Sequence, residues 1–169
     1  MTDKVNDVST AVNSQEDQVG FEILKIFIKN VSFEAPNSPD IFREEWKPEI
    51  SVQLANLSNQ LNETGLTEVC LRITVTAKMG DKTAFLVEVE QSGIFNTVGF
   101  SEEQLGHMHG AFCPNILFPY ARETIDSLLI KAGFPAVQLA PVNFDALYMQ
   151  RLEQIQEDKS QADNKEGNA

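Results

Sequence analysis

The chain has 169 residues, with 25 acidic and 13 basic side chains and a formal net charge of −12. This length suffices for one domain with a hydrophobic core, and the charge disfavours nucleic acids and anionic lipids as partners. No apolar run of about 18 residues predicts a transmembrane helix, and no basic segment followed by an apolar one predicts a secretory signal. The two cysteines, Cys70 and Cys113, are far apart in the sequence, which is typical of a reduced, cytoplasmic protein.

The chain begins and ends with polar segments. Residues 1–19 and 157–169 lack periodicity and predict disordered acidic tails, so a single domain is expected over residues 20–156. Residues 20–34 predict a first strand. Its apolar side chains occupy both faces, with Phe21, Ile23, Phe27, Val31 and Phe33 on one and Leu24, Ile26 and Ile28 on the other. Because a strand with one solvated face alternates cleanly, this pattern predicts that a helix layer or another subunit covers both faces.

Three more strands follow a loop at residues 35–40 that contains two prolines. They are expected at residues 49–57, 67–78 and 83–91, and the tight turn Met79-Gly-Asp-Lys82 joins the last two. Strands joined by short turns pair antiparallel, so the sequence predicts a four-stranded antiparallel meander.

Helices are expected in the remainder of the domain. Ser101-Glu-Glu-Gln104 predicts a capping box at the start of a long helix. Pro114 and Pro119 predict a kink or break near Cys113. A short C-terminal helix is expected to begin after Asn143 and to carry an apolar stripe. Since the strands precede the helices, the predicted fold class is α+β.

Catalytic patterns are weak in this sequence. Neither a phosphate-binding loop nor a nucleophile elbow is present. His107 and His109 lie near Cys113, but residues two apart on a helix point to different sides and no fourth zinc ligand stands at the usual spacing; a polar helix face or a helix–helix contact is the alternative. Glu88 and Glu90 share a strand face. They could form a catalytic pair, although a solvated face that attracts a basic peptide is favoured. No enzyme activity, cofactor or metal is expected.

Phenylalanine is abundant, with 11 residues in the chain. Several of them flank the predicted helices, among them Phe95, Phe100, Phe112 and Phe118. A thin sheet with one helix layer would not easily bury them all, so subunit interfaces or exposed apolar grooves are expected.

Several blocks of the chain closely resemble the SecB family of export chaperones. The resemblance covers about residues 20–152, and its longest blocks contain eleven and nine uninterrupted residues. The blocks are Val31-Ser-Phe-Glu-Ala-Pro-Asn37, Trp46-x-Pro-Glu49, Leu71-Arg-x-Thr-Val-Thr-Ala77, Thr83-Ala-Phe-Leu-x-Glu-Val89, Gly93-Ile-Phe95, Cys113-Pro-Asn-Ile-Leu-Phe-Pro-Tyr-Ala-Arg-Glu123 and Leu139-Ala-Pro-Val-Asn-Phe-Asp-Ala-Leu147.

The resemblance implies a fold, an assembly and a function. The fold is a four-stranded antiparallel sheet with a long helix and a shorter C-terminal helix. Two protomers pair through their first strands, and two such dimers pack through the long helices into a homotetramer. The implied function is that of an ATP-independent holdase, which keeps unfolded preproteins in apolar grooves and delivers them to the motor SecA.

The resemblance also implies two sets of site residues. The client groove would be lined by Trp46, Ile50, Val52, Leu54, Phe144, Leu147 and Tyr148. The basic, zinc-holding C-terminal segment of SecA would bind Glu34, Leu86 and Glu88, so that any zinc belongs to SecA. At Asn30 the family usually has an aspartate, and one charge per protomer is therefore missing from that surface.

Two other functions are weighed against the holdase. A small-molecule enzyme or ligand carrier would need convergent polar groups in a closed pocket, and the sequence offers no such set. A plain oligomeric scaffold would bind no unfolded chains.

Overall fold

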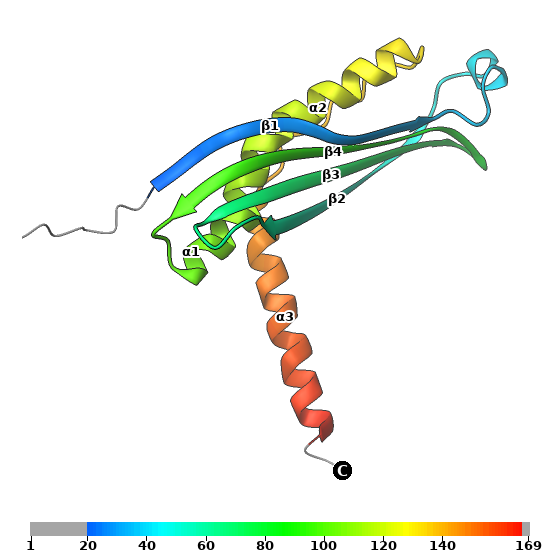
Figure 1. Ribbon diagram of the computed structural model, residues 1–169. Coiled ribbons are helices and arrows are strands. Elements are labelled where there is room, and N and C mark those ends of the chain that lie inside the picture. The colour runs from blue at the N-terminus through cyan, green and yellow to red at the C-terminus, as the bar shows by residue number, and fades with distance from the viewer. Residues whose placement is uncertain (1–19, 167–169) are drawn as a thin grey trace, which may run out of the picture.

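A four-stranded antiparallel sheet lies against helices on one of its faces (Figure 1). The computed structural model describes residues 20–166. Its strands follow the spatial order β1-β4-β3-β2, and their bounds are Gly20–Glu34 (β1), Glu49–Gln60 (β2), Leu66–Met79 (β3) and Lys82–Val98 (β4). The α+β class and the antiparallel sheet predicted from the sequence are confirmed.

The predicted meander holds for β2, β3 and β4 but is wrong for β1. The first strand pairs with β4 and not with β2, from Gly20 opposite Val98 to Glu34 opposite Leu86. The connection after β1 contains the 3-10 helix η1 (Asp40–Arg43) and leads to the opposite edge of the sheet. A connection of this length is too long for a tight hairpin, so β1 and β2 are free to lie at separate edges.

Two irregularities explain why the apolar residues of β1 do not alternate. The register with β4 shifts at Leu24 and at Lys29. Each extra residue reverses which face the following side chains take. Ile26 and Ile28 therefore face the helix side together with Val31, although simple alternation predicts the opposite. The apolar residues that simple alternation assigns to two faces of β1 therefore lie largely on one face, because of the two β-bulges.

The last strand is longer than predicted because Gly93 does not end it. β4 continues to Val98. A Cβ atom at Gly93 would lie 2.7 Å from the ring of Phe95 and 3.2 Å from Leu117. The glycine therefore lets an aromatic ring and a helix approach the strand closely, which is a usual reason for glycine within a strand.

The predicted capping box starts the helical half of the chain. The backbone N–H of Gln104 donates to Ser101 Oγ (3.3 Å), and the backbone N–H of Ser101 donates to Gln104 Oε1 (2.8 Å). Helix α1 (Glu102–His107) continues through a π-helical turn, η2 (Met108–Phe112), into α2 (Cys113–Lys131). The irregularity expected near Cys113 is this π turn, and Pro119 lies inside α2 without ending it.

The core lies between α2 and the two central strands. Val69, Leu71, Ile73 and Val75 of β3 and Phe85, Val87 and Val89 of β4 are fully buried there, with Leu117, Ile125 and Leu129 of α2. Burial of each such side chain contributes about 1.5–3 kcal/mol to folding. The opposite face of the sheet is not covered by any element among residues 20–166 (Figure 1).

Helix α3 extends further than predicted. It runs from Phe144 to Glu166, whereas the sequence predicts a disordered tail from residue 157. The added segment is rich in good helix formers, and the first glycine after Phe144 is Gly167. The predicted tail at residues 1–19 and the last three residues lie outside the described part of the chain. No helix within residues 20–166 has the length and apolar character needed to cross a membrane.

Candidate functional site: an apolar groove and a charged sheet face

A groove of about 600 Å³ separates the edge strand β2 from α3. Leu54 and Leu57 of β2 line one wall. Leu147, Leu152 and Ile155 of α3 line the other, and each of these three side chains is at least 36% exposed. A contiguous exposed apolar surface of this kind is typical of a binding site.

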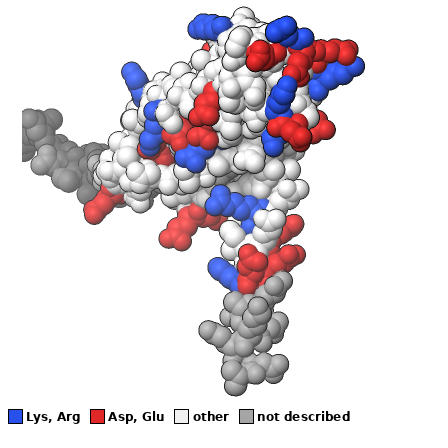
Figure 2. All heavy atoms as spheres, turned by 90° about the vertical axis from the view of Figure 1, so that its right-hand side faces the viewer, with Lys and Arg blue, Asp and Glu red and all other residues white. Residues whose placement is uncertain are grey.

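The first turns of α3 attach this wall to the body. The Ala146 N–H donates to Asn143 Oδ1 (3.0 Å), which confirms Asn143 as the expected N-terminal cap. Phe144 is only 5% exposed and its ring meets Phe118 edge-on, with centroids 5.8 Å apart. Beyond Tyr148, every α3 residue through Ser160 is exposed. Figure 2 shows the helix projecting from the body.

The structure brings four of the seven predicted groove residues together. Leu54, Phe144, Leu147 and Tyr148 all line the groove. Phe144 lies at its base, because its side chain is buried in the core.

The other three predicted groove residues lie outside this hollow. Trp46 belongs to an aromatic cluster, where its ring centroid is 6.4 Å from Phe85 and 5.7 Å from Phe134. Ile50 and Val52 face the helix side, because their register partners Ala77 and Val75 are buried there. They are 39% and 44% exposed and extend the apolar surface along β2 away from Leu54.

The polar part of the groove was not predicted from the sequence. Asn56 Nδ2 donates to the carbonyl oxygen of His109 (2.8 Å), and Asn56 Oδ1 is buried with no partner among the described atoms. Burial lowers the pKa of His109. Asn56 occupies the helix-facing register of β2, a signal that alternation alone could have supplied. His109 lines the groove because the π-helical turn η2, which contains it, packs against β2.

The residues predicted for motor binding share the helix-free face of the sheet. Glu34 on β1 lies opposite Leu86 on β4, and Asn30 lies opposite Glu90. Glu88 lies between Leu86 and Glu90 on the same face of β4. Glu34 and Asn30 are exposed, whereas Leu86 and Glu88 are half-buried. The structure therefore brings all four predicted residues onto one surface.

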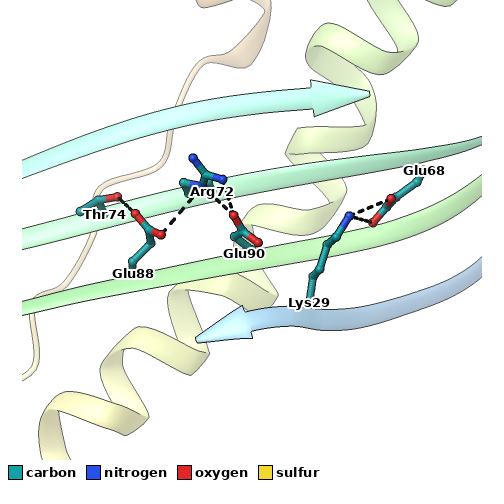
Figure 3. Close-up of polar contacts among 6 residues, drawn as sticks. All are labelled: Lys29, Glu68, Arg72, Thr74, Glu88 and Glu90. Atoms are coloured by element: carbon teal, nitrogen blue, oxygen red, sulfur yellow. Dashed lines mark hydrogen bonds and ion pairs between the residues drawn. The ribbon is translucent and has the colours of Figure 1, made fainter. Parts of the chain in front are cut away.

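Basic side chains already occupy part of this face (Figure 3). Arg72 Nε donates to Glu90 Oε1 at 2.8 Å and lies 3.9 Å from Glu88 Oε1. Thr74 Oγ1 donates to Glu88 Oε2 at 2.9 Å, and Lys29 Nζ lies 2.9 Å from Glu68 Oε1. The hydrogen bond that Arg72 donates to the Glu90 carboxylate raises the pKa of Arg72. The face is thus an ordered network of both charge signs, and not a purely acidic surface.

The two histidines point to different partners. His107 Nε2 lies 2.6 Å from Asp145 Oδ1 on α3, whereas His109 Nε2 lies 3.4 Å from Thr97 Oγ1 on β4. Burial raises the pKa of the Cys113 thiol to about 12, so this group stays protonated. Within the described residues, no group of three or more His, Cys, Asp or Glu side chains is arranged to hold a metal ion.

The sequence matches one protein family over most of its length. The family model described as "Preprotein translocase subunit SecB" matches residues 14–155. A relative in Nitrosococcus oceani, named protein-export protein SecB, is 55% identical over 146 residues, covering 85% of this chain and 88% of the relative. A relative of the same name in Pseudomonas syringae is 50% identical over 157 residues, covering 93% and 95%.

A solved structure has a similar fold. It is a SecB-like chaperone from Mycobacterium tuberculosis in complex with a peptide from an antitoxin. The TM-score is 0.54 at 16% sequence identity, and the match covers 72% of this chain and 87% of the other. At this identity the similarity concerns the fold alone.

Proposed function

We infer that this chain, which belongs to the SecB family, is an export chaperone that binds unfolded preproteins. It works in the cytoplasm without ATP and without catalysis, and it keeps its clients competent for translocation. The observation that carries this function is the exposed apolar groove between β2 and α3, in a chain whose 50–55% identical relatives are named protein-export proteins.

The groove binds apolar segments that a folded protein would bury. Each large apolar side chain that a client removes from water contributes up to about 1.5–3 kcal/mol. Leu147, Leu152 and Ile155 supply such surface on α3, and Ile50 and Val52 continue it along β2. Several shallow contacts along one long client give tight binding with little dependence on client sequence. Selectivity then follows from how long a client stays unfolded.

The chain assembles into a homotetramer. Its first strand is an edge strand with exposed apolar side chains, among them Ile23, Leu24 and Ile28, which supports pairing of two protomers through β1. On α2, Tyr120 and Ile130 are also exposed, which supports packing of two dimers through their long helices. Four copies would present several grooves to one client chain.

The helix-free sheet face binds SecA, to which the client is delivered. Glu34, Leu86 and Glu88 provide carboxylates and one apolar contact for the basic, zinc-holding segment of the motor, and the zinc belongs to SecA. Charge-assisted hydrogen bonds between carboxylates and Lys or Arg suit this contact. Asn30 supplies no charge, and its register partner on β4 is the acidic Glu90.

A refolding assay tests the chaperone function. A denatured preprotein is diluted into buffer with stoichiometric protein and no nucleotide, and its refolding is followed by fluorescence. We expect refolding to slow by about tenfold or more, because binding removes the unfolded client from the refolding pool. An unchanged refolding rate would contradict the proposal.

A further inference from the structure

Two glycines receive the ring of Tyr148. Gly106 is in α1 and Gly110 is in the π-helical turn η2. A Cβ atom on Gly106 would lie 2.7 Å from Tyr148 Oη, and one on Gly110 would lie closer still to Tyr148 Cδ2. Side-chain carbons do not approach other heavy atoms this closely in a packed protein. We call this contact of Gly106, Gly110 and Tyr148 the tyrosine seat.

A neighbouring contact supports the same arrangement. The ring of His107, between the two glycines, meets Tyr148 edge-on with centroids 5.7 Å apart. His107 Nε2 also lies 2.6 Å from Asp145 Oδ1, one turn before Tyr148 on α3. Single π turns are frequently found at functional sites, and here the π turn carries Gly110.

Tyr148 is the last residue of α3, up to Ser160, that is not exposed. From Met149 to Ser160 every residue of the helix is exposed. The direction of α3 therefore depends on its first two turns. Since an α-helix rises about 1.5 Å per residue, a tilt of about 10° at Tyr148 moves Ile155 by about 2 Å. Such a movement changes the distance between the two apolar walls.

We propose that Gly106 and Gly110 are positioning residues of the groove: by seating Tyr148 they fix the angle of α3 and thereby the width between α3 and β2. The inference rests on the proposed function for the claim that this groove holds clients. The position of α3 is measured separately, so failure of one is distinguishable from failure of the other.

The test begins with Gly110→Ala. Alanine ordinarily stabilises a helix relative to glycine, but at the seat its methyl group must displace Tyr148. Cysteine spin labels at Gln53 on β2 and Gln156 on α3, both exposed, report the distance between the walls. Cys70 and Cys113 are buried and free, so the label is directed to the introduced cysteines. Labelled chain is diluted with unlabelled chain so that each assembly carries one labelled copy.

The expected result is a shifted or broader distance distribution in Gly110→Ala and an affinity for denatured preprotein weakened by about three- to tenfold. Tyr148→Ala should also broaden the distance distribution. This second variant keeps the test valid if Gly110→Ala fails to fold. In the Tyr148→Ala background, adding Gly110→Ala should change the distance no further, because no ring remains to be displaced. Met149→Ala, on the exposed side of α3 and outside the groove, is the matched control and should behave as wild type.

Two results would overturn the inference. One is a wild-type distance distribution in Gly110→Ala. The other is a shifted distance distribution with unchanged client affinity, which would show that the tyrosine seat does not affect client binding. If the wild-type protein did not bind clients, the proposed function would be contradicted. The effect of the tyrosine seat on the position of α3 would then be judged from the distance distributions alone.

Discussion

Arg72 on β3 binds the carboxylate of Glu90, its register partner on β4, with Nε 2.8 Å from Oε1. The same guanidinium lies 3.9 Å from Glu88 Oε1. Two carboxylates of the proposed motor-binding face therefore already have a basic partner within the chain. A basic segment that binds there must compete with Arg72 for them.

Replacing Arg72 should strengthen binding of a basic partner. In Arg72→Gln, Glu88 and Glu90 lose their internal counter-charge, and we expect a Lys- and Arg-rich peptide to bind about threefold more tightly at low salt. The modest size reflects the small net contribution of ion pairs that solvent screens in part. Fluorescence anisotropy at two salt concentrations measures it. Lys82→Gln is the matched control, because Lys82 pairs with Glu44 away from this face. Equal affinities of Arg72→Gln and wild type would contradict the competition.

A charge in the groove should weaken client binding. In Leu147→Asp an acidic group replaces an apolar side chain that lines the groove, and the client affinity should fall by about tenfold or more. Met149→Asp places the same group on the same helix at a side chain that is 54% exposed and outside the groove. Titration of a labelled denatured preprotein compares the two. Equal losses in both variants would show that the charge acts through the helix in general and not through the groove.

A charge on the first strand should reduce the size of the assembly. Ile28 is 51% exposed on the edge strand β1, and Ile28→Glu would place a carboxylate where two protomers are proposed to pair. Native mass spectrometry should show smaller species than in the wild type. Leu61→Glu, at an exposed apolar residue between β2 and β3, should keep the wild-type mass. A wild-type mass for Ile28→Glu would argue against pairing through β1.

Stability should fall in mild acid in part because of His109. Burial lowers the pKa of this imidazole below the unfolded value of 6.5, so the unfolded state takes up a proton more readily. Its contribution to stability is therefore complete above about pH 6.5 and is lost as the pH falls through the folded pKa. Urea unfolding at pH 7.5 and pH 5 should show a smaller drop in His109→Gln than in wild type. An equal drop would mean that His109 is protonated as readily in the folded protein.

Local patterns predicted many of the elements correctly. The capping box at Ser101, the cap at Asn143 and the alternation of β3 are determined by neighbouring residues, and each is present in the structure. The order of strands is a property of the whole sheet. Whether β1 lies beside β2 or β4 depends on tertiary packing, and a meander was the wrong inference.

The site was partly predictable for the same reason. The residues of the proposed motor-binding face share one face because strand alternation and register place them there, apart from the two bulges in β1. The groove depends on how α3 meets β2, which no spacing in the sequence specifies. The family resemblance places Trp46 with Leu54 in the groove, whereas the structure places Trp46 in a separate aromatic cluster. No local sequence pattern identifies Gly106 and Gly110 as part of the site, because their contact with Tyr148 is formed only in the folded structure.

The proposal that unfolded chains bind between β2 and α3 is tested most directly by site-specific photocrosslinking. A benzophenone amino acid at Ile155, which lines the groove, and one at Met149, which does not, are compared in complexes with a denatured preprotein. Crosslinks to the client from position 155, and few from position 149, are the predicted result. Equal crosslinking from both positions, or none from position 155, would contradict the placement of clients in this groove.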